Sequence, residues 1–242
     1  MITILGTGHV FRIAEPVAFI VKHMWPDAVL VELDMPRYNA MSLPAEQISY
    51  EGQPWAYRRM AKYQRSIAEE YGSQVGAEFV AAIETGRSIG AAIEFIDTDA
   101  SRTMDEIWKE MPFLERTRFT FSMIGDRFGS RRKADRTVME MAENEEEYFA
   151  AMRRKYPTLV RKLIDERDAH MAARINEASK RYGTMIVVVG DAHVEGIAKQ
   201  LEAESIRKIR LKTLMSPEKM NALRSELWSG KGPGEGVSEE RT

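Results

Sequence analysis

The sequence contains no cysteine and only four histidines among its 242 residues. Without cysteine the chain cannot form a disulfide, a thiolate zinc site or a cysteine nucleophile. A metal ion would therefore need His, Asp, Glu or backbone oxygen as its ligands. The sequence also lacks any run that approaches the roughly 20 apolar residues of a membrane-spanning helix. It begins without the basic and apolar segments of a signal peptide, so we expect a cytoplasmic protein.

A net charge of one sign is missing too, because 35 Lys and Arg residues face 37 Asp and Glu residues. The resulting net charge of −2 leaves no global positive field that could hold nucleic acid. We therefore expect no nucleic-acid partner. Hydrophobic residues at 44% and charged residues at 30% are typical of a soluble globular protein.

Short β-branched runs alternate with helical stretches along the chain. They predict five strands, at residues 2–5, 28–33, 91–97, 185–189 and 206–211. Strands that alternate with helices are typical of an α/β protein whose sheet is covered by helices on both faces. We therefore predict an α/β fold with a mixed, largely parallel sheet. The continuous apolar run Val187–Val189 predicts a central strand.

A long helical block, at about residues 104–182, separates the third and fourth predicted strands. Pro157 divides this block, because the residue before a proline avoids the helical region whereas proline itself suits a first helical turn. We expect the helix that begins there to stop at Gly183. Residues 1–228 are expected to form a single domain. The Gly-rich tail, residues 229–242, has too few apolar residues to fold by itself and is expected to be disordered.

One motif occurs twice in the chain. Residues 6–14 (GTGHVFRIA) match residues 190–198 (GDAHVEGIA), so that both copies read G-x-x-H-V-x-x-I-A. Each copy follows a predicted strand, opens a predicted helix and contains one histidine. Open α/β sheets bind ligands beyond the carboxyl ends of their strands, so His9 and His193 can reach one cavity. The alternative is that each histidine only caps its helix or packs over the sheet.

Acidic residues stand at the ends of the second and third predicted strands. Side-chain alternation along residues 31–34 (VELD) places Glu32 on the face opposite to its two neighbours, where a buried carboxylate needs a cation or a metal. The third strand leads into Asp97 and Asp99. For Asp99, capping of the following helix is as good an interpretation as a role in a site.

Further candidates lie on predicted helices. A spacing of about 3.6 residues along the helix after Pro157 places Arg167 in its apolar stripe, where a guanidinium needs an acidic or oxyanion partner unless it reaches solvent. Glu166 is a candidate site acid, although it can equally form a surface pair with His170. Glu78, near the start of another amphipathic stretch, either stabilises the helix dipole or serves as a site acid.

In their order along the chain, these motifs resemble the TraB family, which includes the PrgY pheromone-shutdown proteins and is related to the Tiki proteases. The resemblance covers about residues 1–200. It rests on ILGTGHV (4–10), VELD (31–34) with Arg37, GAEF (76–79), FIDTD (95–99) with Thr103, ERD (166–168) with Met171 and Ala172, and VVGDAHVEGI (188–197). The sequence departs from the family in having no membrane span and in Gly8, where relatives often have alanine.

The resemblance implies a metal-dependent hydrolase, most simply a peptidase of the Tiki kind that acts on a peptide or protein substrate. It implies a site that contains both G-x-x-H histidines and acidic residues, with manganese or cobalt as the metal and zinc as an alternative. We expect His9, His193 and Glu32 to be the metal ligands. Glu78 or Glu166 would be the general base, and Arg167 would stabilise the developing oxyanion or orient Glu32. The remaining acids would contact the substrate or support the metal ligands: Asp34, Asp97, Asp99 and Asp191.

Two alternatives stay open. The same fold can serve a non-catalytic protein that binds a peptide or haem, and metal-dependent turnover would separate that protein from the hydrolase. Ester hydrolysis is the other alternative, because erythromycin esterases are distantly similar and use site histidines. Such activity would survive chelation of metals. The sequence is also compatible with a homo-oligomer.

Overall fold

The computed structural model describes residues 1–8, 11–41, 58, 74–125 and 145–229. Its centre is one sheet of five strands in the order β3-β2-β4-β1-β5. The strands are β1 (Ile2–Thr7), β2 (Ala28–Val31), β3 (Ala92–Phe95), β4 (Met185–Gly190) and β5 (Ile206–Ile209). The predicted α/β fold and all five predicted strands are confirmed, and every strand pair in the described part of the chain is parallel.

β4 is the middle strand, as its apolar run predicted. It pairs with β1 on one side and with β2 on the other. Both faces of this strand are buried, which explains why its sequence is continuously apolar rather than alternating. The register sets Thr7 opposite Gly190 and Val31 opposite Val188. The residues that follow β1, β4 and β2 therefore leave the sheet next to one another at its carboxyl edge.

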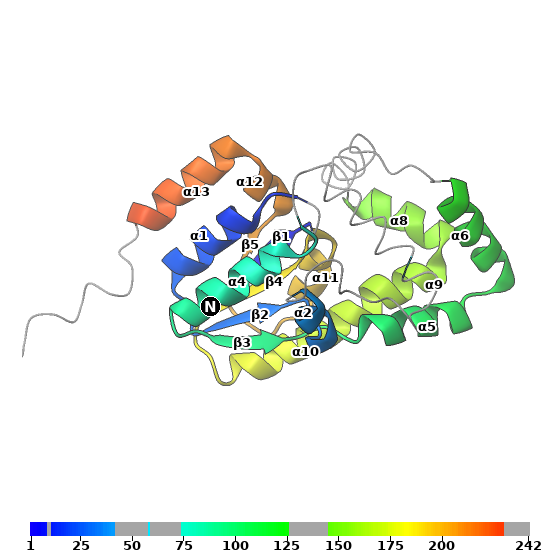
Figure 1. Ribbon diagram of the computed structural model, residues 1–242, viewed down its shortest axis with the longest axis horizontal. Coiled ribbons are helices and arrows are strands. Elements are labelled where there is room, and N and C mark those ends of the chain that lie inside the picture. Colours follow the sequence, from blue (N-terminus) through cyan, green and yellow to red (C-terminus); the bar gives the residue numbers. More distant parts are fainter. Residues whose placement is uncertain (9–10, 42–57, 59–73, 126–144, 230–242) are drawn as a thin grey trace, which may run out of the picture.

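Helices cover both faces of the sheet (Figure 1). Alternate side chains of the strands, such as Leu5 and Val188, pack on one face and their neighbours, such as Ile4 and Val187, on the other. The first face is covered by α1 (Ala14–Met24), α4 (Ala77–Ser88), α12 (Leu211–Met215) and α13 (Pro217–Ser229). The second face is covered by α10 (Glu166–Ser179) and α11 (Val194–Ala198).

The helices between β3 and α10 form a block beyond one end of the sheet (Figure 1). This block contains α5 (Ala100–Glu110), α6 (Phe113–Gly125), α8 (Glu145–Lys155) and α9 (Pro157–Val160), whereas α2 (Met35–Met41) follows β2. The block has a small apolar core of its own, in which Met104, Ile107 and Phe119 are buried. The single domain stays a prediction, and all of the expected tail after Ser229 lies outside the described residues.

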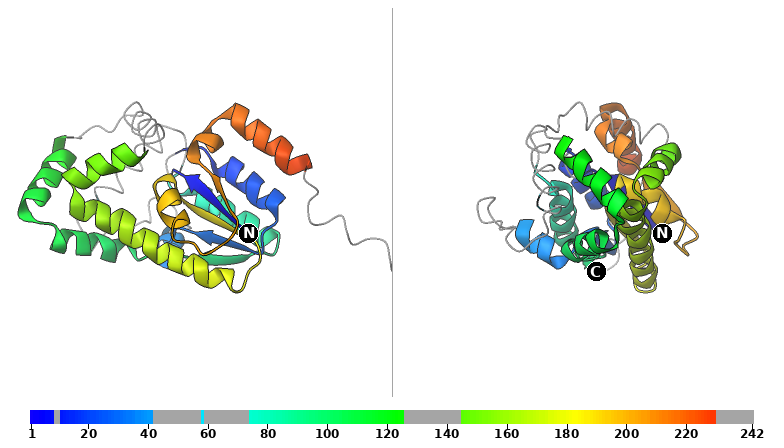
Figure 2. Two further views of the ribbon diagram at one scale, coloured as in Figure 1. Left: turned by 180° about the vertical axis from the view of Figure 1, so that it is seen from behind. Right: turned by 90° about the vertical axis from the view of Figure 1, so that its right-hand side faces the viewer.

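One long helix joins the block to the sheet and is visible in yellow-green in the left view of Figure 2. It begins at Pro157, as predicted, and Oε1 of Glu115 accepts the backbone N–H groups of Thr158 at 3.0 Å and Leu159 at 3.2 Å. α9 continues into a π-helical turn at residues 161–165 and then into α10, which ends at Ser179. The sequence did not predict the π turn, and the 3.6-residue spacing does not hold across it.

Candidate functional site

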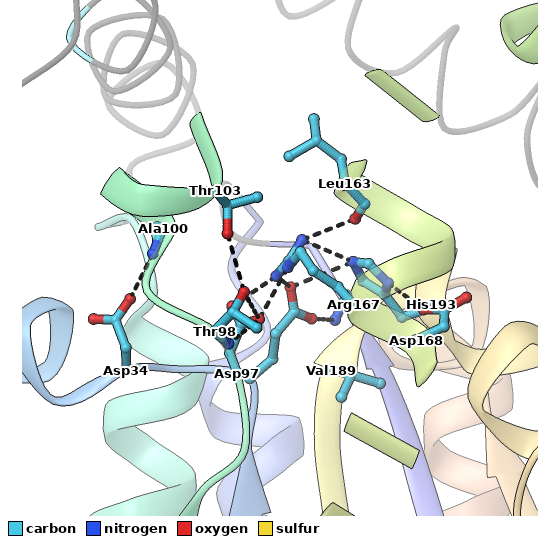
Figure 3. Close-up of polar contacts among 12 residues, drawn as sticks. Asp34, Asp97, Thr98, Ala100, Thr103, Leu163, Arg167, Asp168, Val189 and His193 are labelled. Atoms are coloured by element: carbon cyan, nitrogen blue, oxygen red, sulfur yellow. Dashed lines mark hydrogen bonds and ion pairs between the residues drawn. The ribbon is translucent and has the colours of Figure 1, made fainter. Parts of the chain in front are cut away.

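Polar side chains from four segments meet beyond the carboxyl edge of the sheet (Figure 3). Glu32 follows β2, Asp97 follows β3, and His193 ends the 3-10 turn that follows β4. Arg167 lies in the first turn of α10. Since α10 leads directly into the amino end of β4, its first turn lies at the same edge as the carboxyl ends of the strands.

Arg167 is at the centre of this group. Its Nε donates a hydrogen bond to Oδ1 of Asp97 at 2.9 Å, and its Nη2 donates to Oδ2 of the same carboxylate at 2.7 Å. Nη2 also donates to Oε1 of Glu32, and Nη1 donates to the backbone oxygen of Leu163 at 3.1 Å. Burial lowers the pKa of Arg167. The charge of Glu32 and the hydrogen bonds and charge of Asp97 raise this pKa by more, so the net shift is upward. Arg167 thus stays charged and has the acidic partners that its place in the sequence required.

Glu32 is a buried carboxylate, with 3% of its surface exposed. Its Oε1 accepts a hydrogen bond from Arg167, and its Oε2 accepts one from the backbone N–H of Gly190 at 2.6 Å. A buried carboxylate is stable only with a cation and hydrogen bonds around it. Glu32 has both, and the glycine that ends β4 supplies one of them.

His193 lies between two carboxylates and a guanidinium. Its Nδ1 is 2.6 Å from Oδ1 of Asp168. On the other side of the ring, Nε2 is 3.2 Å from Nη1 of Arg167 and 3.4 Å from Oε1 of Glu32. Burial raises the pKa of Asp168, and the hydrogen bond with His193 lowers it by less. The histidine of the second G-x-x-H motif is therefore part of the ionic group and does not merely cap α11, for which it makes no side-chain capping bond.

Asp34 and Arg37 extend the group beyond Asp97. Arg37 donates from its Nε to Oδ2 of Asp34 at 2.9 Å and from its Nη2 to Oδ2 of Asp97. Oδ2 of Asp34 also accepts the backbone N–H of Ala100, the first residue of α5, at 3.1 Å. Burial raises the pKa of Asp97, but the hydrogen bond and charge of Arg167, together with the charge of Arg37, lower it below its ordinary value. Asp97 is therefore an ionised carboxylate between two guanidinium groups.

The charges of the group do not balance among the described residues. Its four carboxylates are Glu32, Asp34, Asp97 and Asp168, and its two guanidinium groups are those of Arg37 and Arg167. When all four carboxylates are ionised, two negative charges are in excess. All four of these acidic residues are buried or nearly so, and water therefore screens this excess only weakly.

Two acids that the sequence placed near the substrate have other partners. Asp99 caps α5, because its side chain accepts the backbone N–H of Arg102 at 2.8 Å. Asp191 accepts from Nη2 of Arg210 at 2.9 Å and from the backbone N–H of Leu211 at 2.8 Å. It thereby ties the end of β4 to the start of α12. In this structure both side chains hold the fold together at the edge of the site.

The remaining candidates are spread more widely. Glu166 lies on the outer side of α10, where it pairs with Arg161 and with Nζ of Lys162 at 3.0 Å. Its side chain is 44% exposed and has no polar contact with Glu32 or His193 among the described residues. Glu78 is 1% exposed in the first turn of α4. His9, the first G-x-x-H histidine, lies outside the described residues.

Sequence reasoning did not assign Asp168 or Arg37 to the site, although both belong to motifs that it singled out. Asp168 contacts His193, which is 25 residues away along the chain, and Arg37 contacts Asp97, which is 60 residues away. The available signal was the position of each residue beside an assigned one, in ERD and just after VELD. Neither motif states which distant residue its side chain reaches.

The donors of the group are of the kinds that bind divalent metals. Nε2 of His193 and Oε1 of Glu32 are 3.4 Å apart. This is close to the separation of roughly 3.4 Å between two ligands of a tetrahedral ion with bonds of about 2.1 Å. No group of three or more His, Cys, Asp or Glu side chains in the described ranges is arranged to hold a metal. The pair and the excess negative charge fit a divalent ion, which would compete with Arg167 for the same two atoms.

No helix in the described part of the chain is long and apolar enough to cross a membrane. The chain is similar to an uncharacterized protein of Methanocaldococcus jannaschii, with 29% identity over 211 residues. The matched region is 83% of this chain and 53% of the relative, so the chain spans about half the length of the curated relative that it matches.

A family model supports the resemblance that the motifs indicated. The model of the TraB/PrgY/gumN family matches residues 1–212. This range includes all five strands, both G-x-x-H motifs and every residue of the ionic group around Arg167. It ends within α12, before the last helix of the structure. The chain therefore belongs to the TraB/PrgY/gumN family.

Proposed function

We propose that the protein is a divalent-metal-dependent hydrolase that acts on peptides or proteins. The observation that carries the proposal is the pair formed by Nε2 of His193 and Oε1 of Glu32, 3.4 Å apart inside a buried group whose described residues include four carboxylates and two guanidinium groups. We propose His9 as the third ligand. It follows β1 by two residues, and β1 ends beside β4, with Thr7 opposite Gly190. Manganese or cobalt is the favoured ion, with zinc as the alternative.

A divalent ion in this position would supply a water of lowered pKa and a polarised substrate carbonyl. The residues of the chain have separate tasks. Asp168 orients His193, and the backbone N–H of Gly190 fixes Glu32. Arg167 is held by two hydrogen bonds to Asp97, so it can stay in place when it shares Glu32 with a ligand. Its guanidinium contacts both donors and would stabilise negative charge that develops on a substrate oxygen.

Of the two proposed general bases, we keep Glu78 and not Glu166. A general base has to lie within hydrogen-bond reach of the proton that it accepts. Glu166 is bound on the outer side of α10 by Arg161 and Lys162. Glu78 is buried in the first turn of α4, and since α4 leads into β3, this turn lies at the carboxyl edge of the sheet. Glu78→Gln should lower turnover by about 100-fold or more and leave metal binding intact, whereas Glu166→Gln should change neither.

The test is metal content by elemental analysis, followed by cleavage of unstructured peptides with manganese, cobalt or a chelator. The wild-type protein should bind the metal near-stoichiometrically and lose cleavage on chelation. His193→Ala should lose both properties. His23→Ala is the matched control, because His23 lies in the last turn of α1, where its ring contacts the backbone oxygen of Phe19. Stoichiometric metal in His193→Ala would overturn the ligand assignment.

One observation favours a second candidate, hydrolysis by His193 without a metal. Asp168 and His193 form a carboxylate–imidazole pair, and Arg167 supplies a cation beside Nε2. This arrangement can serve a general base and an oxyanion in ester hydrolysis. Cleavage of ester substrates that persists in chelator and is abolished in His193→Ala would favour this candidate. Absence of cleavage under every condition would favour a protein that binds a peptide or haem.

A further inference from the structure

The two sides of the His193 ring face different partners, and this difference identifies the ring nitrogen that carries the proton. Nε2 lies 3.2 Å from Nη1 of Arg167. A guanidinium nitrogen can only donate a hydrogen bond, so Nε2 has to accept in this contact. Nδ1, which is 2.6 Å from Oδ1 of Asp168, is then the protonated nitrogen and donates to the carboxylate. The contact between Nε2 and Glu32 is longer, at 3.4 Å, and Oε1 of Glu32 already accepts from Arg167.

Gly196 leaves the space that the carboxylate of Asp168 occupies. It lies within α11, and a Cβ atom at this position would overlap Oδ2 of Asp168 and lie only 2.8 Å from its Cγ. Any residue other than glycine would therefore push the Asp168 carboxylate away from its present place. Glycine weakens a helix because it loses more backbone freedom on folding than other residues do. The close approach of Asp168 is a physical reason for a glycine inside this short helix.

We infer that Asp168 and Gly196 are positioning residues that hold His193 in the tautomer with Nδ1 protonated and Nε2 free to bind a ligand. Asp168 supplies the acceptor, and Gly196 supplies the space for it. Neither residue touches the site between Nε2 and Glu32, so both act through His193. A carboxylate that holds a metal-binding histidine in this way fixes the tautomer and the orientation of its ring.

The two G-x-x-H motifs differ at the position that this arrangement requires. Gly196 of the second copy aligns with Arg12 of the first copy. The first copy thus carries a side chain where the second needs open space. The second copy also runs directly into its helix, with α11 beginning at Val194, whereas α1 begins at Ala14, five residues after the first histidine. The support from Asp168 is therefore specific to His193, and the two histidines are not equivalent.

The first test reads the tautomer directly and needs neither metal nor activity. Long-range proton–nitrogen correlation spectra of metal-free protein with nitrogen-15 histidine distinguish protonated from unprotonated ring nitrogens. The His193 signals are assigned by removing the other three histidines one at a time, with His9→Gln, His23→Gln and His170→Gln. We expect Nδ1 of His193 to be protonated and Nε2 to be unprotonated. Protonation of Nε2, with or without protonation of Nδ1, would overturn the inference.

The second test uses substitutions with matched controls. Asp168→Asn keeps the shape of the side chain and removes its charge, and Gly196→Ala moves the carboxylate without changing it. Both variants should contain a mixture of the two His193 tautomers. Both should also bind manganese about 10–100-fold more weakly than the wild type does, as measured by titration calorimetry with manganese alone. Asp165→Asn, on the same long helix, and Gly183→Ala, whose Cβ would lie 3.4 Å from its nearest neighbour, should match the wild type in both measurements.

The metal-binding part of this inference rests on the proposed function, and the two can fail separately. If the wild-type protein binds no manganese but shows the expected tautomer, which Asp168→Asn alters, the proposed function fails and the positioning role stands. If the wild type binds manganese and folded Asp168→Asn and Gly196→Ala leave both the tautomer and the affinity unchanged, the positioning role fails and the proposed function stands. Thermal melting followed by circular dichroism tests whether each variant is folded. The proton–nitrogen correlation spectrum of the wild-type protein is sufficient to determine the tautomer, without any variant.

Discussion

The long helix that begins at Pro157 takes part in a buried ionic network around Arg167 and in an exposed one, in which Asp165 pairs with Arg153 of α8. Around Arg167 the side chains are buried: Arg167 is 14% exposed, Glu32 3% and Asp97 1%. On the side of the helical block, Arg153 is 50% exposed and its partner Asp165 37%. The same kinds of residue therefore form ion pairs in a low dielectric at the sheet and partly exposed to solvent at the block.

This difference determines what each network can do. Exposed ion pairs add little to stability, because water solvates the separated charges almost as well. A buried network costs much free energy to desolvate, and it is weak evidence for stability alone. It does, however, hold each charged group in one position. The network around Arg167 lies where open parallel sheets bind ligands, whereas the exposed pair joins α8 to the π turn. Burial and position together support a functional role for the first.

The largest expected difference between the networks is the cost of removing one cation. Arg167→Ala leaves the buried carboxylates of Glu32 and Asp97 with less compensation and should lower the free energy of unfolding by about 3–5 kcal/mol. Arg153→Ala should lower it by less than about 1 kcal/mol, because its pair with Asp165 is exposed. Urea unfolding followed by circular dichroism measures both. Equal effects would mean that burial does not distinguish the two networks.

A buried pair outside the candidate site sharpens the comparison. Asp191 pairs with Arg210 directly beside Gly6, and a Cβ atom at Gly6 would overlap Oδ1 of Asp191. Gly6→Ala should therefore destabilise the fold by roughly 1–3 kcal/mol through overpacking, whereas Gly183→Ala should stay within about 0.5 kcal/mol of the wild type. Thermal melting compares the two variants. A Gly6→Ala protein as stable as Gly183→Ala would show that the Asp191–Arg210 pair moves aside without cost.

The contributions of the two networks to stability should also differ in their dependence on acidic pH. The pKa of Asp97 is held below its ordinary value of 3.8, so the ionised carboxylate stabilises the fold above this value and the contribution is lost as the pH falls below it. Asp97→Asn should therefore be less stable than the wild type at pH 7, and the difference should shrink as the pH falls below 3.8. Urea unfolding at a series of decreasing pH values is the measurement. Asp165→Asn serves as the exposed control, and a difference for Asp97→Asn that is constant with pH would contradict the assignment.

The smallest expected effect concerns salt. At 1 M ionic strength the screening length falls to about 3 Å, so the small destabilisation by Arg153→Ala should disappear. The destabilisation by Arg167→Ala should persist, because ions do not enter the buried group. Unfolding curves at about 0.1 M and 1 M sodium chloride make this comparison. Loss of the Arg167→Ala effect in high salt would show that the group is open to solvent.

The strands were predictable from the sequence because burial on both faces of a parallel sheet demands continuous apolar runs, as in Val187–Val189. The start of the long helix at Pro157 was predictable because proline suits a first helical turn. The π turn at residues 161–165 was not, since its composition is that of an ordinary helix. Asp99 illustrates an undecided case: its position suited both a cap and a site, and the structure shows the cap.

The sequence by itself determined the alternation of strands and helices, the buried position of Glu32 and the need of Arg167 for acidic partners, because these follow from local periodicity and from the cost of burying charge. Only the tertiary structure decided which acids those partners are. Glu32, Asp97 and Asp168 are far apart along the chain, and the parallel register of β2, β3 and β4 brings the ends of their strands together with the first turn of α10. It also separated Glu166 from Arg167, its neighbour in sequence, because successive residues of a helix point in different directions.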